Sequence, residues 1–149
     1  MMIRHEPFME EALKEAHAAA LEGEVPVGAV LVKDGQIIAR GHNTRERDQD
    51  PLGHAEINVI RQGCALLHSW RLTGCTLYVT LEPCPMCAGA IVNARIPAVY
   101  YGAKDDKAGC CGSVLNLFEE RFNHHPRIYG GLLEEECVAL LQSFFQNLR

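Results

Sequence analysis

Gly53-His54-Ala55-Glu56 and Glu82-Pro83-Cys84-Pro85-Met86-Cys87 are the two segments that say most about this chain. Cys84 and Cys87 are three residues apart, so their sulfur atoms leave the same face of a helix. If that helix begins at Cys84, its unpaired N–H groups and the positive end of its dipole help to keep both thiols ionised. With the imidazole of His54, these thiolates form a candidate set of metal ligands.

Three protein ligands leave the fourth position of a tetrahedral zinc ion to water, which is typical of a catalytic site. Zinc lowers the pKa of such a water from about 15.7 to about 7. Glu56 need not bind the metal, and we expect it to carry a proton from this water to the substrate. The order H-x-E followed by P-C-x-x-C is the signature of zinc-dependent nucleobase deaminases. The sequence therefore predicts a hydrolytic deaminase with one Zn²⁺ per subunit, bound by His54, Cys84 and Cys87.

Two other interpretations of the same residues stay open. A closed structural zinc site would need a fourth ligand, for which Cys75, Cys110 and Cys111 are available. A redox-active C-x-x-C pair would give no role to His54 or Glu56. The combination of H-x-E with a later P-C-x-x-C favours the catalytic interpretation.

Composition sets the wider expectations. A chain of 149 residues with 48% apolar residues predicts one domain over residues 1–149. We expect a cytoplasmic protein without a membrane span, because no apolar run reaches 18 residues and the N-terminus lacks the apolar stretch of a signal peptide. The odd count of seven cysteines favours reduced thiols. The net charge of −5 is unfavourable for nucleic-acid binding, although several basic residues fall in predicted loops.

Hydrophobic periodicity and turn residues predict alternating helices and strands. We expect helices at 7–22, 54–67, 84–93 and 134–148, a short helical piece at 114–120, and strands at 27–32, 36–42, 76–81, 98–102 and 127–129. Residues 45–53 are expected to form a polar loop. The predicted inward faces of three helices comprise Phe8, Leu13, Ala16, Ala20 and Leu21; Ile57, Ile60 and Leu67; and Cys137, Leu140, Leu141, Phe144, Phe145 and Leu148. Such alternation indicates an α/β sheet covered on both faces.

The chain resembles the cytidine deaminase superfamily, and within it most closely the bacterial tRNA-specific adenosine deaminases. The likeness covers nearly the whole chain. It includes Glu24-Val25-Pro26-Val27-Gly28-Ala29-Val30, Thr80-Leu81-Glu82-Pro83-Cys84, Met86-Cys87-Ala88-Gly89-Ala90 and Tyr101-Gly102-Ala103-Lys104-Asp105, together with residues 41–43, 54–57, 112–113, 122–124 and 133–137. The zinc motif identifies the superfamily, whereas the segments after Tyr101 and at Asn123-His124, and the Phe144-Phe145 ending, indicate the tRNA branch.

This resemblance implies a three-layer α/β/α cytidine-deaminase-like fold with a central mixed sheet of about five strands. It also implies a homodimer that converts adenosine to inosine at the wobble position of a tRNA anticodon. By position, His54, Cys84 and Cys87 would hold zinc and Glu56 would move protons. The resemblance also implies substrate contacts. Asn43 would hydrogen-bond the flipped base, and Val27 and Gly28 would line its pocket. Asp105 and Asn123 would contact nucleotides of the loop, and Phe145 would lie near the RNA.

Some positions depart from the tRNA branch. Gly53 precedes the zinc histidine where the family usually has alanine, and Cys110-Cys111 falls where small residues are usual. With the acidic net charge, these departures leave open a deaminase of a free nucleobase or nucleoside, such as guanine, adenine or cytosine. A non-catalytic zinc-binding subunit of a deaminase is a third hypothesis, and the presence of Glu56 argues against it.

Overall fold

The computed structural model describes residues 4–148; residues 1–3 and 149 of the predicted domain lie outside this range. The secondary-structure elements, in chain order, are α1 (Glu6–Leu21), β1 (Gly28–Lys33), β2 (Gln36–His42), α2 (Arg45–Asp48), α3 (Ala55–Leu67), β3 (Cys75–Leu81), α4 (Pro85–Asn93), β4 (Ala98–Ala103), the 3₁₀ turn η1 (Leu117–Glu119), β5 (Arg127–Tyr129) and α5 (Glu134–Asn147). Within residues 4–148, no helix has the length and apolarity needed to cross a bilayer.

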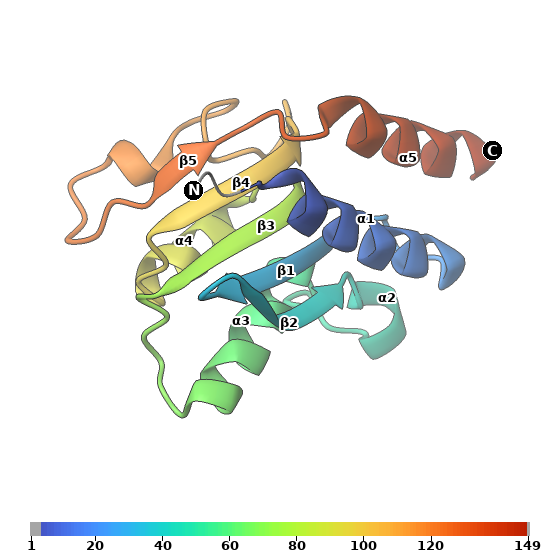
Figure 1. Cartoon of the computed structure of the whole chain (residues 1–149). Coiled ribbons are helices and arrows are strands. Elements are labelled where there is room, and N and C mark those ends of the chain that lie inside the picture. Colours follow the sequence, from blue (N-terminus) through green and yellow to red (C-terminus); the bar gives the residue numbers. More distant parts are fainter. Residues whose placement is uncertain (1–3, 149) are drawn as a thin grey trace.

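The five strands form one mixed sheet in the order β2-β1-β3-β4-β5 (Figure 1). The hairpin of β1 and β2 is antiparallel, and β1 also pairs antiparallel with β3. The pairs β3–β4 and β4–β5 are parallel. The strand predicted at 76–81 is therefore central, and the expected mixed sheet of about five strands is confirmed.

Two apolar clusters lie on opposite faces of the sheet, because successive side chains of a strand alternate between its faces. Leu31 and Leu77 join the cluster formed with α3 and α4, whereas Val30 and Tyr78 join the cluster formed with α1 and α5. The helices accordingly make two layers, one on each side of the sheet (Figure 1). The predicted three-layer α/β/α fold is confirmed.

The directions of the strands place several strand ends at one edge of the sheet, where a site can form. Strands β2, β3 and β4 all end at this edge, and β1 begins there, since β1 is antiparallel to both of its neighbours. The residues that follow or precede these ends are Val27 before β1, Asn43 after β2, Glu82 after β3 and Lys104 after β4. Ligands of open α/β sheets bind outside such carboxyl ends.

The predicted helix faces needed correction. On α1 the buried residues are Met9, Ala12, Ala16 and Ala19, and Leu21 is 90% exposed. On α3 the buried residues are Ala55, Glu56, Val59 and Gly63, so Ile57, Ile60 and Leu67 are only partly buried. On α5 only Cys137 is fully buried among the predicted stripe, because the rest of this helix extends beyond the sheet (Figure 1). The expected polar loop at 45–53 contains the short helix α2.

Candidate active site

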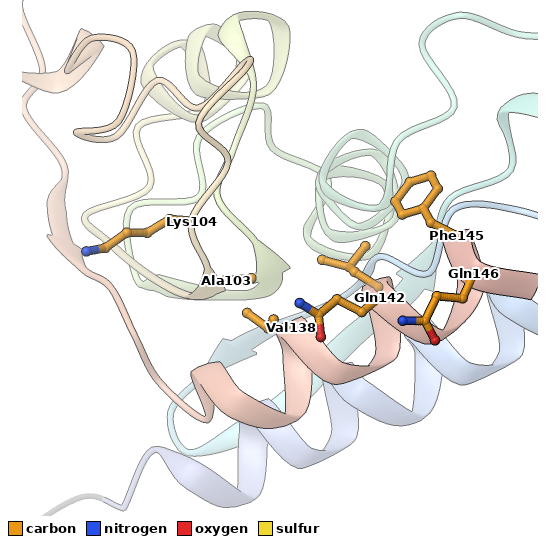
Figure 2. Close-up of a pocket in the computed structure, with 7 residues that line it drawn as sticks. Ala103, Lys104, Val138, Gln142, Phe145 and Gln146 are labelled. Carbon is orange, nitrogen blue, oxygen red and sulfur yellow. The ribbon is translucent and has the colours of Figure 1, made fainter.

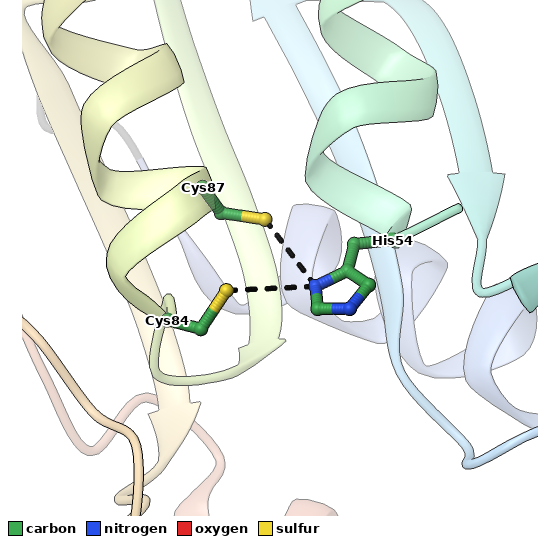
Figure 3. A group of neighbouring side chains, drawn as sticks. All are labelled: His54, Cys84 and Cys87. Carbon is green, nitrogen blue, oxygen red and sulfur yellow. Dashed lines mark hydrogen bonds between the residues drawn. The ribbon is translucent and has the colours of Figure 1, made fainter. Parts of the chain in front are cut away.

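His54, Cys84 and Cys87 meet between the first turns of two neighbouring helices (Figure 3). His54 is the N-cap residue of α3, Cys84 is the N-cap residue of α4, and Cys87 lies in the first turn of α4. The Nδ1 atom of His54 lies 3.6 Å from Sγ of Cys84 and 3.5 Å from Sγ of Cys87. A tetrahedral zinc ion with Zn–S of about 2.3 Å and Zn–N of about 2.0 Å separates sulfur from nitrogen by about 3.5 Å. The donor set therefore fits zinc in both chemistry and spacing.

Hydrogen bonds among these three side chains shift the pKa of each. The hydrogen bond from the Cys87 thiol, helped by His54, lowers the pKa of Cys84 to about 4. The same interaction raises the pKa of Cys87, and the hydrogen bond to Cys84 raises the pKa of His54. One thiolate thus stands beside one thiol and one imidazole, and a divalent cation that binds here replaces their protons.

Within residues 4–148, no fourth histidine, cysteine or carboxylate joins this cluster. The cysteines considered above as a fourth ligand, Cys75, Cys110 and Cys111, lie outside it. A closed structural site is therefore disfavoured, and the contact of His54 with both sulfurs is unlike a simple redox pair. The set leaves room for one exchangeable ligand, as catalytic zinc sites do.

Glu56 lies beside these ligands in the first turn of α3 and is almost fully buried. Desolvation raises the pKa of Glu56 to about 7. A cation bound by the neighbouring side chains would favour the ionised form of the carboxyl group. A carboxyl group whose pKa is close to neutrality is suited to accept and return protons at physiological pH.

A cavity of about 170 Å³ opens onto His54, Glu56 and Cys84. It is smaller than the roughly 300–1,000 Å³ of pockets for drug-sized ligands, so it suits a single ring system. Its other lining residues are Val25, Val27, Asn43, Arg45, Leu81, Glu82, Asp105 and Ala108. The structure therefore brings together seven of the ten predicted site residues: six line the cavity, namely His54, Glu56, Cys84, Asn43, Val27 and Asp105, and Cys87 contacts His54 beside it.

Gly53 and Arg45 show how the mouth of this cavity is shaped. A Cβ atom on Gly53 would lie 3.0 Å from the backbone nitrogen of Arg45, so glycine allows α2 to approach the start of α3 closely. Glu24, which is buried, accepts hydrogen bonds from the backbone N–H groups of Glu46 and Arg47 and so stabilises the first turn of α2. From the sequence, Arg45 was one of several basic residues in predicted loops, and only the structure places it at the cavity.

The other three predicted site residues lie away from both the cavity and the cysteine–histidine cluster. A Cβ atom on Gly28 would lie 2.1 Å from the carbonyl oxygen of Ala12, so Gly28 faces α1 and permits its close packing on the sheet. Asn123 is exposed in the segment between η1 and β5. Phe145 is half exposed and borders a separate hollow of about 510 Å³ between α5 and the end of β4 (Figure 2).

A second hollow, of about 430 Å³, adjoins the catalytic cavity. It shares Val25, Asn43 and Arg45 with the cavity and is also lined by Phe144 and Phe145. The predicted aromatic pair on α5 therefore lies next to the site without entering it.

Comparison with known proteins assigns this chain to one family. Residues 3–149 match the model of the MafB19-like deaminases. This chain belongs to that family. The deaminase is 56% identical over 149 residues to the tRNA-specific adenosine deaminase of Bacillus subtilis (strain 168), which covers 99% of this chain and 92% of the relative.

Solved structures give the same assignment. One, from a study of A-to-I editing by tRNA:A34 deaminases at the wobble position of transfer RNA, is 49% identical, with a TM-score of 0.89 over 91% of this chain and 99% of that chain. The guanine deaminase of Bacillus subtilis is 36% identical, with a TM-score of 0.67 over 97% of this chain and 95% of that chain. The deaminase thus shares its fold with enzymes named for RNA and for free-base substrates.

Proposed function

We propose that this deaminase, a single domain over residues 1–149, hydrolyses adenosine to inosine at the wobble position of a tRNA anticodon. The observation that carries the proposal is the triad of His54, Cys84 and Cys87 beside the buried carboxyl group of Glu56, at a cavity of about 170 Å³. Full-length similarity to a tRNA-specific adenosine deaminase supports the choice of substrate. A tRNA substrate also agrees with the cytoplasmic location expected from the sequence.

The catalytic roles follow from the positions of the groups. Zinc held by His54, Cys84 and Cys87 would supply Lewis-acid activation of a water molecule. The carboxylate of Glu56 would accept a proton from the attacking water and deliver it to N1 of adenine as the water oxygen bonds to C6. Glu56 then transfers the second water proton to the amino group, the C6–N bond breaks, and ammonia leaves. The backbone N–H of Cys84 at the start of α4 would stabilise charge that develops on the attacking oxygen.

The proposed substrate contacts are divided between the cavity and its surroundings. Asn43 and Val27 would hold the flipped base, and Asp105 would contact the neighbouring nucleotide. The adjoining hollow gives room for nucleotides on either side of that base, with Phe145 at its border and the cation of Arg45 at the mouth. A free base would need only the cavity, so this extension favours a polynucleotide. Asn123 and Gly28 are not needed for the cavity, and Asn123 stays a predicted RNA contact.

We also propose a homodimer formed through the α3–α4 groove, which we define by Ile57, Ile60, Met86, Gly89 and Ala90. This hollow of about 580 Å³ lies on the outer side of α3 and α4, and Trp70 and Leu52 border it with much of their surface exposed. An exposed apolar patch of this kind is typical of a protein–protein interface. Ile57 and Ile60, which were predicted to face inward, would in this dimer be covered by the second copy of the chain.

One assay tests the proposed substrate. The purified zinc-loaded protein would be incubated with an anticodon stem-loop that has adenosine at the wobble position, and in parallel with free guanine, adenine, cytosine and their nucleosides. We expect inosine in the RNA together with ammonia, and no product from a stem-loop with guanosine at the same position. Ammonia from free guanine without inosine in the RNA would reject the proposal in favour of the runner-up.

That runner-up is a deaminase of a free nucleobase. Its specific support is the 36% identity to the guanine deaminase of Bacillus subtilis and the acidic net charge of −5. The same triad and Glu56 would perform the hydrolysis. Only the contacts between the substrate and the walls of the cavity would differ.

A further inference from the structure

Glu82 is a carboxylate at the end of β3 that the catalytic roles above do not use. It is 2% exposed, and its backbone N–H donates to the carbonyl of Ala103 at the end of β4. Its Oε1 atom accepts hydrogen bonds from the backbone N–H of Asp105 at 3.0 Å and from the Ser113 hydroxyl at 2.5 Å. Its Oε2 atom accepts from the backbone N–H groups of Cys111 at 2.9 Å and of Ser113 at 3.1 Å.

These four donors occupy the acceptor capacity of Glu82, because a carboxylate offers about four lone-pair sites. Glu82 borders the cavity, yet its oxygens are already engaged by the loop 104–113. It therefore has no acceptor position left for a substrate and is not a catalytic residue. All four donors belong to one loop, so the carboxylate holds both ends of this loop at the edge of the sheet.

The loop 104–113 forms one wall of the cavity through Asp105 and Ala108. Hydrogen bonds continue from Glu82 into this wall. The Asp105 side chain accepts from the backbone N–H groups of Lys107 and Ala108, and its carbonyl accepts from Gly109. The position of the wall is thus tied to Glu82 through the backbone of Asp105.

Gly109 shows independently that the loop packs closely against the carboxylate of Glu82. A Cβ atom at position 109 would lie 2.4 Å from Cδ of Glu82 and 2.5 Å from the carbonyl oxygen of Asp105. The glycine is therefore needed for the close approach of the loop to the carboxylate. Cys111 is also buried in this loop, and its N–H is one of the donors.

We infer that Glu82 is a positioning residue that presets the Asp105–Ala108 wall of the cavity for the substrate base. The inference rests on the proposed function, because the wall is expected to contact the nucleotide that reacts. Glu82 acts through the loop and not through the metal ligands or Glu56. Its loss should consequently weaken substrate binding more than it slows the chemical step.

Glu82→Gln tests this directly. The amide keeps the shape of the side chain but places an NH₂ group against backbone N–H donors, which leaves donors without acceptors. We expect KM for the anticodon stem-loop to rise by about tenfold, because the wall is displaced, with kcat changed by less than about threefold. Zinc content should equal that of the wild type. Amide hydrogen exchange at Asp105, Cys111 and Ser113 should become at least about tenfold faster.

Ser113→Ala is the milder second variant, because it removes one donor and leaves the carboxylate with three. It should change KM in the same direction by less, and it should have no added effect in the Glu82→Gln background, since both changes act on one hydrogen-bond network. Glu119→Gln is the matched control, an exposed glutamate on η1 that should leave KM and exchange unchanged.

The outcomes separate two failures. A wild-type protein that forms no inosine rejects the proposed function, and the exchange measurement still reports on Glu82. Unchanged exchange at Asp105 in Glu82→Gln, or loss of zinc with a fall in kcat at constant KM, overturns the positioning role. A lower melting temperature with wild-type KM and kcat also overturns it, because the residue would then contribute only to stability.

Discussion

The side-chain carbonyl oxygen of Asn43 accepts a hydrogen bond from the backbone N–H of Ala55 at 2.9 Å. Ala55 is the first residue of α3 and stands between His54 and Glu56. Asn43 therefore fixes the turn that carries His54 and Glu56, and the donors of its amide nitrogen are not used in this bond. The hydrogen bond to Ala55 and the substrate contact implied by the resemblance are compatible in this geometry.

Two variants separate these roles of Asn43. Asn43→Ala should lower the free energy of unfolding by about 1 kcal/mol, the usual cost of losing a helix cap, and should also reduce kcat/KM. Asn43→Asp keeps an acceptor for Ala55 but loses the amide donor, so it should be nearly as stable as the wild type and still impaired. Urea unfolding and inosine formation measure the two effects. Wild-type activity of Asn43→Asp would remove the amide from base recognition.

Glu56→Gln should abolish most turnover without loss of metal. A general acid–base group contributes typically about 10²–10⁴-fold, so kcat should fall by at least about 10²-fold. Elemental analysis should still find one zinc per subunit, because Glu56 is not among the ligands. Glu10→Gln, at an exposed position on α1, is the control and should behave as the wild type. A variant with normal kcat would take Glu56 out of the reaction.

Removal of zinc by a chelator should expose one thiol selectively. The low pKa of Cys84, about 4, keeps it as a reactive thiolate once the cation is gone. Burial raises the pKa of Cys75 and raises that of Cys137 to about 12, so both should react slowly. Peptide mass spectrometry after alkylation would report the sites, and added Zn²⁺ should protect Cys84. Equal labelling of Cys84 before and after chelation would contradict a zinc ligand role.

Gly28→Ala should destabilise the fold because the added Cβ meets the backbone of α1, 2.1 Å from the Ala12 carbonyl oxygen. Overpacking of this kind costs about 1–3 kcal/mol or more. Gly74→Ala is the matched control, since its nearest neighbour would be the flexible end of Lys33 at 3.5 Å. Chemical denaturation measures both. If Gly28→Ala kept wild-type stability but lost substrate binding, the original expectation of a cavity-lining glycine would be right.

The proposed dimer can be tested at Gly89 in the α3–α4 groove. No atom outside its own helix lies within 4 Å of a Cβ built there, so Gly89→Lys should fold normally while its charge blocks association. Sedimentation should give a monomer for this variant and a dimer for the wild type. Leu21→Lys, at a side chain that is 90% exposed on α1, should stay dimeric. A dimer that persists in Gly89→Lys would place the interface elsewhere.

The sequence predicted most of the helices and strands from local patterns, and the clustering of His54, Cys84 and Cys87 agrees with the predicted metal site. Cys84 and Cys87 fall in one helical turn whatever surrounds them, and the apolar run at 76–81 is long enough only for a central strand. The same local rules failed where burial depends on distant partners. The apolar stripe of α5 looks like a core face, yet the sheet ends before Phe145 and Leu148, which remain exposed.

Glu24, Glu82 and Gly109 illustrate why part of the site was missed. Each acts through contacts with residues about 20 or more positions away, or through a close approach that only the folded chain creates. Gly28 was assigned to the cavity by resemblance alone, and the missing side chain instead accommodates α1. Periodicity and composition contain no signal for such pairings.

His54 and Cys84 stand at the first turns of two helices, whereas the surfaces that meet the nucleotide come from the segments before β1, after β2 and after β4. Substitutions in these segments that keep Asn43 would change the walls of the cavity and leave His54, Glu56 and the two cysteines in place. Related enzymes could in this way act on bases within a polymer or on free bases by the same reaction. The similarity of this chain to relatives named for each kind of substrate agrees with this view.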